Sequence, residues 1–328
     1  MAKTLPRLSV VIPLYKEEDN VERLVDELHA ALAQYPGTFE LVLVDDGSTD
    51  QTRARLLDAR SREGDHVRVL SHRRNLGQTQ AMQTGLLAAR GEVIAFMDGD
   101  LQNDPADIPA MVSTLEEKQL DLLCGWRKNR QDSLDRTLPS RIANWLIGRV
   151  SGVALHDYGC SLKVGRRDVL EGLDLRGEMH RFIPLWVANL THPSRIAEQP
   201  VNHRARTAGT SKYGISRTPR VILDLLAAWF FLRFRERPGH FFGVAGLMTG
   251  GLGALALGYL LLIKLFGGDI GNRPLLITGV LLALVGLQLI TTGLVAEMLT
   301  RLKPHKQPPL TRDTGHSTWA KGDHDGTD

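Results

Sequence analysis

Cysteine is scarce in this chain, and so are the signals of secretion and of nucleic-acid binding. The 328 residues include only Cys124 and Cys160, which stand at no metal-ligand spacing and make no disulfide framework, so we expect a reducing compartment. The N-terminus, MAKTLPRLSVVIP, lacks the long apolar core of a signal peptide, and the N-terminal part should therefore stay in the cytosol. No basic run interleaved with aromatic residues occurs before the last third of the chain, and nucleic acid is excluded as a partner.

Two common nucleotide-binding motifs are also missing. No G-x-G-x-x-G follows the first apolar run, and no G-x-x-x-x-G-K-[ST] occurs anywhere. A dinucleotide-dependent dehydrogenase and a P-loop NTPase are therefore disfavoured.

Charge is almost absent from two long stretches near the C-terminus. Residues 241–263 carry no charged side chain, and residues 275–298 carry only Gln288 in the middle and Glu297 near the end as strongly polar groups. At ~1.5 Å per residue each stretch can cross a hydrocarbon core of about 30 Å, which predicts two transmembrane helices. The alternative is a pair of buried helices in a soluble core.

The short connection Gly267–Pro274 makes the two predicted spans a hairpin. Lysine and arginine are dense on both outer flanks, whereas the connection contributes only Arg273, so both flanks and the large N-terminal domain are expected in the cytoplasm. Gly246 and Gly250 form a G-x-x-x-G, a weak signal for close helix packing. The run Pro219–Phe234, with Trp229 and flanking arginines, resembles a helix lying in the membrane interface, and an ordinary core helix is the alternative.

These features divide the chain into four predicted parts. Residues 1–214 form a cytosolic domain, 215–238 an amphipathic juxtamembrane helix, 239–300 the two spans, and 301–328 a polar, disordered cytoplasmic tail.

Apolar runs and helical patterns alternate through the first part of the N-terminal domain. Strands are predicted at Leu8–Pro13, Phe39–Val44, Val67–Ser71 and Val93–Met97, and helices at Glu22–Gln34, Thr52–Glu63 and Gln78–Ala89. This alternation predicts an α/β fold with a mostly parallel sheet covered on both faces.

Acidic clusters follow two of these strands. Asp45-Asp46 ends the second strand and Asp98-Gly99-Asp100 ends the fourth, so both should face one crevice at the carboxyl edge of the sheet. Carboxylates facing a nucleotide diphosphate would repel it unless a hard divalent cation lies between them. Asp98 and Asp100, with Gln102 close by, are therefore predicted to hold such a metal. A D-x-D pair alone is a weak signal, because many loops contain one by chance.

Several motifs in order carry a family resemblance over residues 8–300. VVIPLYKEEDNV, LVDDGSTDQT, RNLGQTQAMQTGLLAARGEVIAFMDGDLQNDP, HDYGCSLKVGRR and HRARTAGTSKYG resemble family 2 inverting glycosyltransferases of the GT-A fold. Within that family the chain is most similar to the polyprenyl-phosphate glycosyltransferases, including dolichyl-phosphate mannose, bacterial glucosyl and aminoarabinose transferases. The resemblance implies a Rossmann-like GT-A catalytic domain followed by the membrane hairpin.

The resemblance also implies roles for single residues. Pro13, Tyr15, Glu17 and Asp46 would contact the base and ribose of the donor, with loop solvation or a helix cap as the alternative for Glu17 and Asp46. Asp98, Asp100 and Gln102 would hold Mg²⁺ or Mn²⁺ against the diphosphate, and Asp157 lies where related enzymes place a general base. The candidates for binding acceptor or donor phosphate are Arg127, Arg204, Arg206, Ser211 and Lys212.

Other residues of the matching motifs are assigned no chemistry. Lys163, Arg166 and Arg167 are expected to be ordinary surface charges, and Cys160 a small buried residue without a neighbouring histidine base. One departure narrows the activity. The processive synthases of the wider family carry Q-x-x-R-W and more spans, whereas this chain has His180-Arg181-Phe182-Ile183-Pro184 and two spans, which favours transfer of a single sugar.

The resulting hypothesis is an inverting, metal-dependent transfer from a UDP- or GDP-sugar to a polyprenyl phosphate such as undecaprenyl phosphate. It would occur at the cytoplasmic face of a bacterial inner membrane, for envelope glycan or lipid modification, and the family resemblance allows a homo-oligomer. Two alternatives remain. A transferase of the same fold could use a lipid hydroxyl of diacylglycerol or ceramide, which would make Asp157 essential as a base, or the chain could be a non-catalytic membrane scaffold.

Overall fold

The computed structural model of the chain describes residues 5–128, 148, 152–204, 230, 234, 237–271, 274–301, 311–312 and 319–320. They belong to two compact units, one formed by residues 1–226 with 307–328 and the other by residues 227–306. The finer division of the chain at residues 214, 238 and 300 stays a prediction.

The first unit begins with the predicted alternation of strands and helices. In chain order it runs β1 (Leu8–Leu14), α1 (Val21–Leu32), β2 (Phe39–Asp45), α2 (Thr52–Glu63), β3 (Val67–Ser71), α3 (Gln78–Ala88) and β4 (Val93–Phe96). Each element agrees with its predicted range to within two residues, because continuous apolar runs mark strands that are buried on both faces.

The remaining elements of this unit complete the sheet and its edges. They are α4 (Asp107–Glu117), β5 (Leu122–Trp126), β6 (Lys163–Arg166), α6 (Arg167–Leu170), the 3₁₀ turn η1 (Met179–Phe182), α7 (Ile183–Val187), the 3₁₀ turn η2 (Pro193–Arg195) and β7 (Ile196–Pro200). The strand order is β3-β2-β1-β4-β6-β5-β7. Only β6 runs antiparallel to its neighbours β4 and β5, which confirms a mostly parallel sheet.

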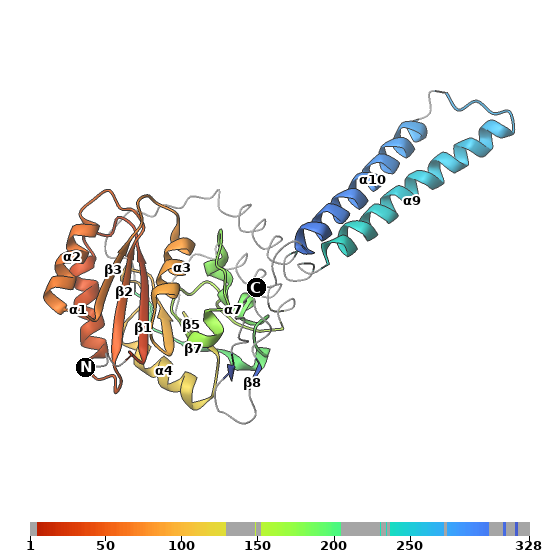
Figure 1. Ribbon diagram of the computed structural model, residues 1–328. Helices are drawn as coiled ribbons and strands as arrows, with labels where there is room; N and C mark the ends of the chain where they lie inside the picture. Colours follow the sequence, from red (N-terminus) through yellow and green to blue (C-terminus); the bar gives the residue numbers. More distant parts are fainter. Residues whose placement is uncertain are drawn as a thin grey trace, which may run out of the picture. The chain divides into compact units, whose positions relative to one another are not determined.

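Helices cover both faces of the sheet. On one face, Leu24 and Leu28 of α1, Leu56 of α2 and Met111 of α4 join alternate β1 residues in a single hydrophobic core. On the opposite face α3 lies so close that a Cβ atom on Gly85 would stand 2.3 Å from a methyl group of Val11. Figure 1 shows α1 and α2 on one side of β1–β3 and α3 on the other.

The strand order places a crevice at the carboxyl ends of β1 and β4. The chain moves outward from β1 through β2 to β3 and then returns to the other side of β1 to form β4. At such a switch point the loops after the two central strands leave in opposite directions, and ligands of open α/β sheets bind between them. The loops after β1 and β4 are those that contain Tyr15, Glu17, Asp98 and Asp100.

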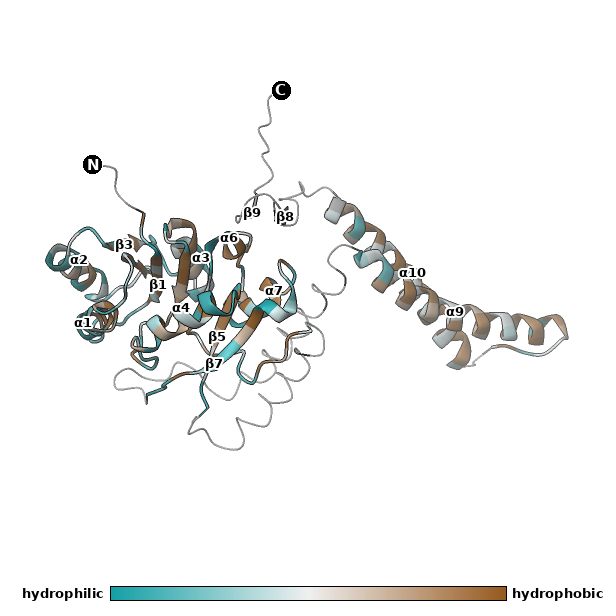
Figure 2. Ribbon diagram, turned by 90° about the horizontal axis from the view of Figure 1, so that it is seen from below, coloured by the Kyte–Doolittle hydropathy of each residue, from teal (hydrophilic) through white to brown (hydrophobic). Residues whose placement is uncertain are grey.

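The second unit consists mainly of two long helices, α9 (Pro238–Leu265) and α10 (Pro274–Arg301). Both are long and apolar enough to cross a membrane. Figure 2 shows apolar and weakly polar colours along most of their length. The observed helices contain the predicted spans and extend beyond them by three residues or fewer at each end.

Glycines bring α9 and α10 into close contact. A Cβ atom on Gly286 of α10 would stand 2.5 Å from the Cα of Gly250, and one on Gly246 would stand 2.7 Å from the carbonyl oxygen of Gly286. The G-x-x-x-G of α9 therefore lies in the helix contact, as its spacing suggested.

The parts that flank the helix pair are described only in small pieces. Of the predicted interfacial helix, the structure describes Phe230 and Phe234 near its end, whose rings pack on Phe241 with centroid distances of 5.3 and 4.8 Å. In the predicted disordered tail it describes Arg301 and one antiparallel pair, β8 (Thr311–Arg312) with β9 (Trp319–Ala320).

Candidate active site

Three loops meet at the carboxyl edge of the sheet in the first unit. The amide of Lys16, after β1, donates to Ser48 Oγ at 3.0 Å, and that of Glu17 donates to Thr52 Oγ1 at 2.9 Å. The amide of Asp46, after β2, donates to the carbonyl oxygen of Leu14 at 2.8 Å. The loops after β1 and β2 therefore form one wall beside the switch point, where Pro13, Tyr15 and Glu17 were expected.

Asp46 is buried, and its carboxylate holds the loop that leads into α3. Its oxygens accept hydrogen bonds from the amides of Leu76 at 2.9 Å and Gly77 at 2.8 Å, and His72 Nδ1 lies 2.8 Å away. Gly47 has a φ of +67°, and a Cβ there would stand 2.3 Å from the backbone of Arg74, so only glycine fits. These contacts give Asp46 a structural task, and its contact with a donor stays a prediction.

Asp98 follows β4 on the face of the sheet that α3 covers. The Gln78 amide, at the start of α3, donates to Asp98 Oδ1 at 2.6 Å. Burial raises the pKa of Asp98 to about 6, and the neighbouring charge of Asp100 adds to this, while a Ser161 hydrogen bond and the cations Lys163 and Arg127 oppose it. Its ionised form is thus poorly compensated by the protein alone.

The turn after Asp98 has an unusual backbone. Leu101 has a φ of +61°, a conformation that costs a branched side chain free energy and that often marks functional sites. The turn brings the amide of Gln102 to 3.2 Å from Asp100 Oδ1, and the carbonyl of Gln102 accepts from the amide of Arg204 at 2.8 Å. Asp100 and Gln102 are therefore held together on the short segment that Asp98 begins.

The chemistry of this segment fits a hard divalent cation. Asp98 and Asp100 are close enough for the charge of one to raise the pKa of the other, a strain that a cation between them would relieve. Among the described residues no three His, Cys, Asp or Glu side chains gather as a ligand set. Two protein carboxylates, with further oxygens from a bound diphosphate and water, is how Mg²⁺ commonly binds beside a nucleotide.

Arg127 and Asp157 form a buried ion pair beside the metal motif. Arg127 Nε donates to Asp157 Oδ2 at 2.7 Å and Arg127 Nη2 donates to Oδ1 at 2.9 Å, a bidentate geometry, and the Gly159 amide donates to Oδ1 at 3.1 Å. The ion pair raises the pKa of Arg127 against the opposing effect of burial. In this structure Asp157 holds the arginine, and its role as a base stays a prediction.

The segment that follows Asp157 ties this pair to the metal motif. Ser161 Oγ accepts from the side-chain amide of Asn103 at 2.6 Å and contributes a hydrogen bond to Asp98. Cys160 is fully buried near Asn103, and burial raises the pKa of its thiol, which confirms the expected inert residue. Residues 157–161 thus fix the distance between the two halves of the site.

The prediction that Lys163 is a surface charge is wrong. Its side chain lies in β6 between Phe96 of β4 and Cys124 of β5, it is 2% exposed, and its ammonium group donates to the carbonyl of Cys160. A buried lysine needs anionic or carbonyl partners, and Asp98 lies near the end of the neighbouring strand. Arg166 and Arg167 retain partly exposed side chains, as expected of surface charges.

The other predicted phosphate-binding residues are not brought together within the described part of the chain. Arg204 is paired with Glu27 at 2.6 Å and with Asp104 at 2.7 Å. Arg206, Ser211 and Lys212 lie outside the described residues.

Several site residues carried no assignment from the sequence. Gln78, Asn103, Ser161 and Lys163 surround Asp98 or its loop, and Thr79 Oγ1 of α3 lies 2.6 Å from His180 Nδ1 of η1. Gln78, Thr79, Asn103, Ser161 and Lys163 all lie in motifs that carry the resemblance, and this was the one signal that could have found them.

Comparison with known proteins agrees with this geometry. Residues 9–173 match the model of the family described as glycosyl transferase family 2. A dodecaprenyl-phosphate galacturonate synthase from Rhizobium johnstonii is 56% identical over 296 residues, 90% of this chain and 88% of that protein. An undecaprenyl-phosphate 4-deoxy-4-formamido-L-arabinose transferase from Pseudomonas fluorescens is 35% identical over 297 residues, 90% of this chain and 85% of that protein.

A solved structure shares the fold. Glucosyl-3-phosphoglycerate synthase from Mycobacterium tuberculosis, in complex with Mn²⁺, uridine diphosphate and glucosyl-3-phosphoglycerate, superposes with a TM-score of 0.55 at 20% identity, over 69% of this chain and 80% of that one. The sheet with its switch point and the Asp98–Asp100 motif define a glycosyltransferase of the GT-A fold. The chain belongs to glycosyl transferase family 2.

Proposed function

We propose that this enzyme transfers one sugar from a nucleotide-sugar to a polyprenyl phosphate. The observation that carries the proposal is the conjunction of two features in one chain. Asp98 and Asp100 lie at the switch point of a GT-A sheet, and the match to polyprenyl-phosphate transferases covers 90% of the chain, which has to include most of the two apolar helices.

The donor would lie across the switch point. Asp98, Asp100 and Gln102 would hold Mg²⁺ or Mn²⁺, which when bound stabilises the charge that develops on the departing diphosphate. Pro13, Tyr15, Glu17 and Asp46 would border the nucleoside. UDP is favoured over GDP because the solved structure of the same fold holds uridine diphosphate with Mn²⁺.

The acceptor would approach the side of Arg127 and Asp157. A phosphate monoester is already ionised near neutral pH and needs little help from a base, whereas a lipid hydroxyl has to lose a proton. Both oxygens of Asp157 accept hydrogen bonds from Arg127 and Gly159, so the geometry favours a cation that is fixed in place over a free carboxylate base. This arrangement supports the phosphate acceptor over the hydroxyl acceptor.

Galacturonate is the sugar we propose. The relative that makes a galacturonate product is 56% identical to this chain, whereas the formamido-arabinose transferases are about a third identical over the same length. The second candidate is therefore the formamido pentose.

The two apolar helices would cross the bacterial inner membrane as a hairpin, with the catalytic domain and the C-terminus in the cytoplasm. The density of arginine and lysine on both outer flanks supports this orientation. A homo-oligomer is part of the proposal.

A transfer assay with the full chain in vesicles tests the proposal. Undecaprenyl phosphate and either radiolabelled UDP-galacturonic acid or UDP-4-deoxy-4-formamido-arabinose would be supplied with Mn²⁺, and the lipid phase would be extracted. We expect label in the lipid phase with the uronic acid donor, and none when a chelator is present. Label only with the pentose donor would replace the proposed sugar, and label only on a supplied diacylglycerol would overturn the acceptor.

A further inference from the structure

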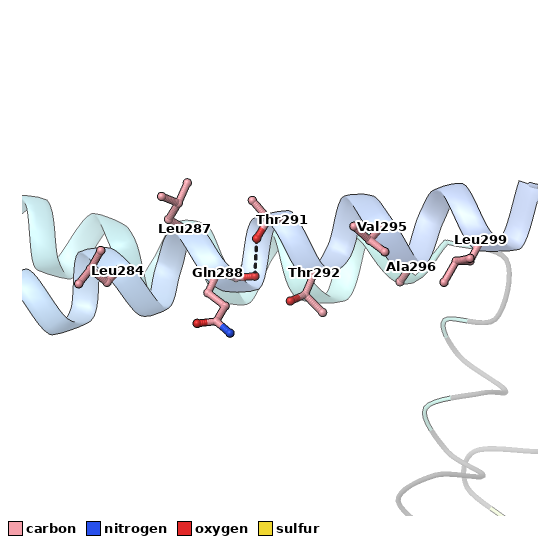
Figure 3. Close-up of a pocket in the computed structure, with 8 residues that line it drawn as sticks. All are labelled: Leu284, Leu287, Gln288, Thr291, Thr292, Val295, Ala296 and Leu299. Atoms are coloured by element: carbon pink, nitrogen blue, oxygen red, sulfur yellow. Dashed lines mark hydrogen bonds between the residues drawn. The ribbon is translucent and has the colours of Figure 1, made fainter.

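The outer face of α10 carries polar side chains halfway along the helix. Gln288, Thr291 and Thr292 are exposed and line a shallow groove whose other walls are apolar, formed by Leu284, Leu287, Val295, Ala296 and Leu299. Figure 3 shows the amide of Gln288 extended away from the helix axis, with no neighbouring side chain beyond it.

This face cannot be served by α9. Gly286 and Ile290 of α10 are the residues that touch Gly246 of α9. Gln288 lies two positions from each of them, which at 3.6 residues per turn places it on the opposite side of the helix. The glycine contact that closes the hairpin therefore leaves the amide of Gln288 facing outward.

The depth of Gln288 makes an unpaired amide costly. It stands fourteen residues after Pro274 and thirteen before Arg301, so ~20 Å of helix lies on either side of it at ~1.5 Å per residue. If the hairpin spans the bilayer as proposed above, on which this inference rests, the amide lies near the midplane, where water is absent and each unsatisfied polar group costs several kcal/mol.

The two threonines do not raise the same demand. Thr291 Oγ1 donates to the backbone carbonyl of Gln288 at 2.9 Å, which satisfies that hydroxyl within its own helix. The phosphate of a polyprenyl acceptor stays at the membrane surface and its chain is apolar, so the lipid cannot pair with an amide at the midplane either. The amide needs a polar group that is itself embedded in the membrane.

We propose that the groove on α10 is the contact between two copies of this chain, with Gln288 of each copy bonded to Gln288 of the other. A primary amide offers both N–H donors and a carbonyl acceptor, so it is complementary to itself across a twofold axis. Polar side chains of this kind join helices in membranes, and Ala296 allows close approach in the next two turns of the groove. The occupant is a second α10, packed on the face opposite to α9.

Site-directed crosslinking in native membranes tests this contact. The natural cysteines, Cys124 and Cys160, are both buried in the first unit, so a new thiol in the helices reports without background. Gln288→Cys is compared with Met248→Cys, which is exposed on the outer face of α9 next to the glycines that contact Gly286 and thus lies at a similar depth. After oxidation with copper phenanthroline we expect at least tenfold more disulfide-linked dimer from the first variant than from the second.

Two further measurements keep the outcome decisive. Gln288→Leu should reduce the dimer recovered in mild detergent at least fivefold, and Gln288→Asn, which keeps the amide, should restore most of it. Alkaline extraction of the membranes reports on the hairpin separately. Release of the protein would refute the spanning topology, whereas retention with equal crosslinking at positions 288 and 248 would refute only the contact.

Discussion

The carboxylates at the end of β4 and those elsewhere around the site are held in different ways. Asp46 and Asp157 each accept several hydrogen bonds from protein groups, from backbone amides and His72 in one case and from Arg127 and Gly159 in the other. Asp98 faces Asp100 in a buried setting, and its pKa rises to about 6.

The difference separates structural from ligand-binding acids. A carboxylate with its oxygens occupied by donors fixes a loop or an arginine, and it gains nothing from a cation. Two carboxylates that destabilise each other favour a divalent ion, because its charge removes the repulsion and the cost of burial together. Five predictions test this division, beginning with the largest effect.

Asp100→Asn should abolish transfer while leaving the fold intact. The loss of a metal ligand that supports the leaving diphosphate should lower kcat roughly 10³-fold, which corresponds to about 4 kcal/mol of transition-state stabilisation. Steady-state transfer assays with Mn²⁺ titration would measure it. Turnover above a tenth of wild type at saturating Mn²⁺ would contradict the metal assignment.

Acidification should weaken metal binding through Asp98. Because its pKa is about 6, protonation below that value removes a ligand, and the apparent Mn²⁺ affinity should fall roughly tenfold per pH unit. Titration of Mn²⁺ binding in the presence of UDP at pH 5 to 8 would show the dependence. Asp98→Asn serves as the control, with weak affinity at every pH.

The same pKa has the opposite sign for folding of the metal-free enzyme. A carboxyl group whose pKa is higher in the folded than in the unfolded state destabilises the fold as the pH rises from about 4 past 6. In EDTA, Asp98→Asn should therefore unfold at a higher temperature than wild type at pH 8, with the difference vanishing at pH 4.5. A lower melting temperature of the variant at pH 8 would show that Asp98 is instead stabilised by its neighbours.

Asp157→Asn should reduce kcat less than thirtyfold, far less than Asp100→Asn. The substitution removes the partner of Arg127 but no base that an ionised phosphate would need. Parallel kinetics of both variants, with circular dichroism as a folding control, would decide the point. Equal and near-total loss in both would favour a hydroxyl acceptor.

Arg204→Gln should have the smallest effect. Its guanidinium is about a third exposed and bonded to Glu27 and Asp104, so the substitution should cost at most about 1 kcal/mol of stability and change kcat less than threefold. Thermal unfolding and the transfer assay together measure both quantities. A tenfold increase in KM for either substrate would restore Arg204 as a phosphate ligand.

The elements that the sequence predicted well share one property. The strands β1 to β4 are buried on both faces and read as unbroken apolar runs, and the long charge-free helices have no other explanation of equal strength. The strands β5 to β7 went unpredicted because they mix small and polar residues, such as Gly125, Lys163, Gly165 and Gln199, whose burial depends on neighbours far along the chain.

The candidate site was predictable in part for the same reason. Asp98 and Asp100 follow a strand that is recognisable locally. The Arg127–Asp157 pair joins residues thirty positions apart, and the burial of Lys163 depends on which strands β6 joins, so neither contact has a local signal. Polar side chains with distant partners are the ones that a single sequence leaves unassigned.

The reversed direction of β6 has a consequence for how such enzymes diversify. Because β6 runs against β5, the chain leaves β5 and enters β6 at the same edge of the sheet, the one that carries Asp98. Residues between Lys128 and Gly152 can therefore be lengthened, shortened or exchanged without shifting the register of any strand. We expect a new acceptor preference to arise by replacing this one connection, while the half of the site that grips the nucleotide is inherited unchanged.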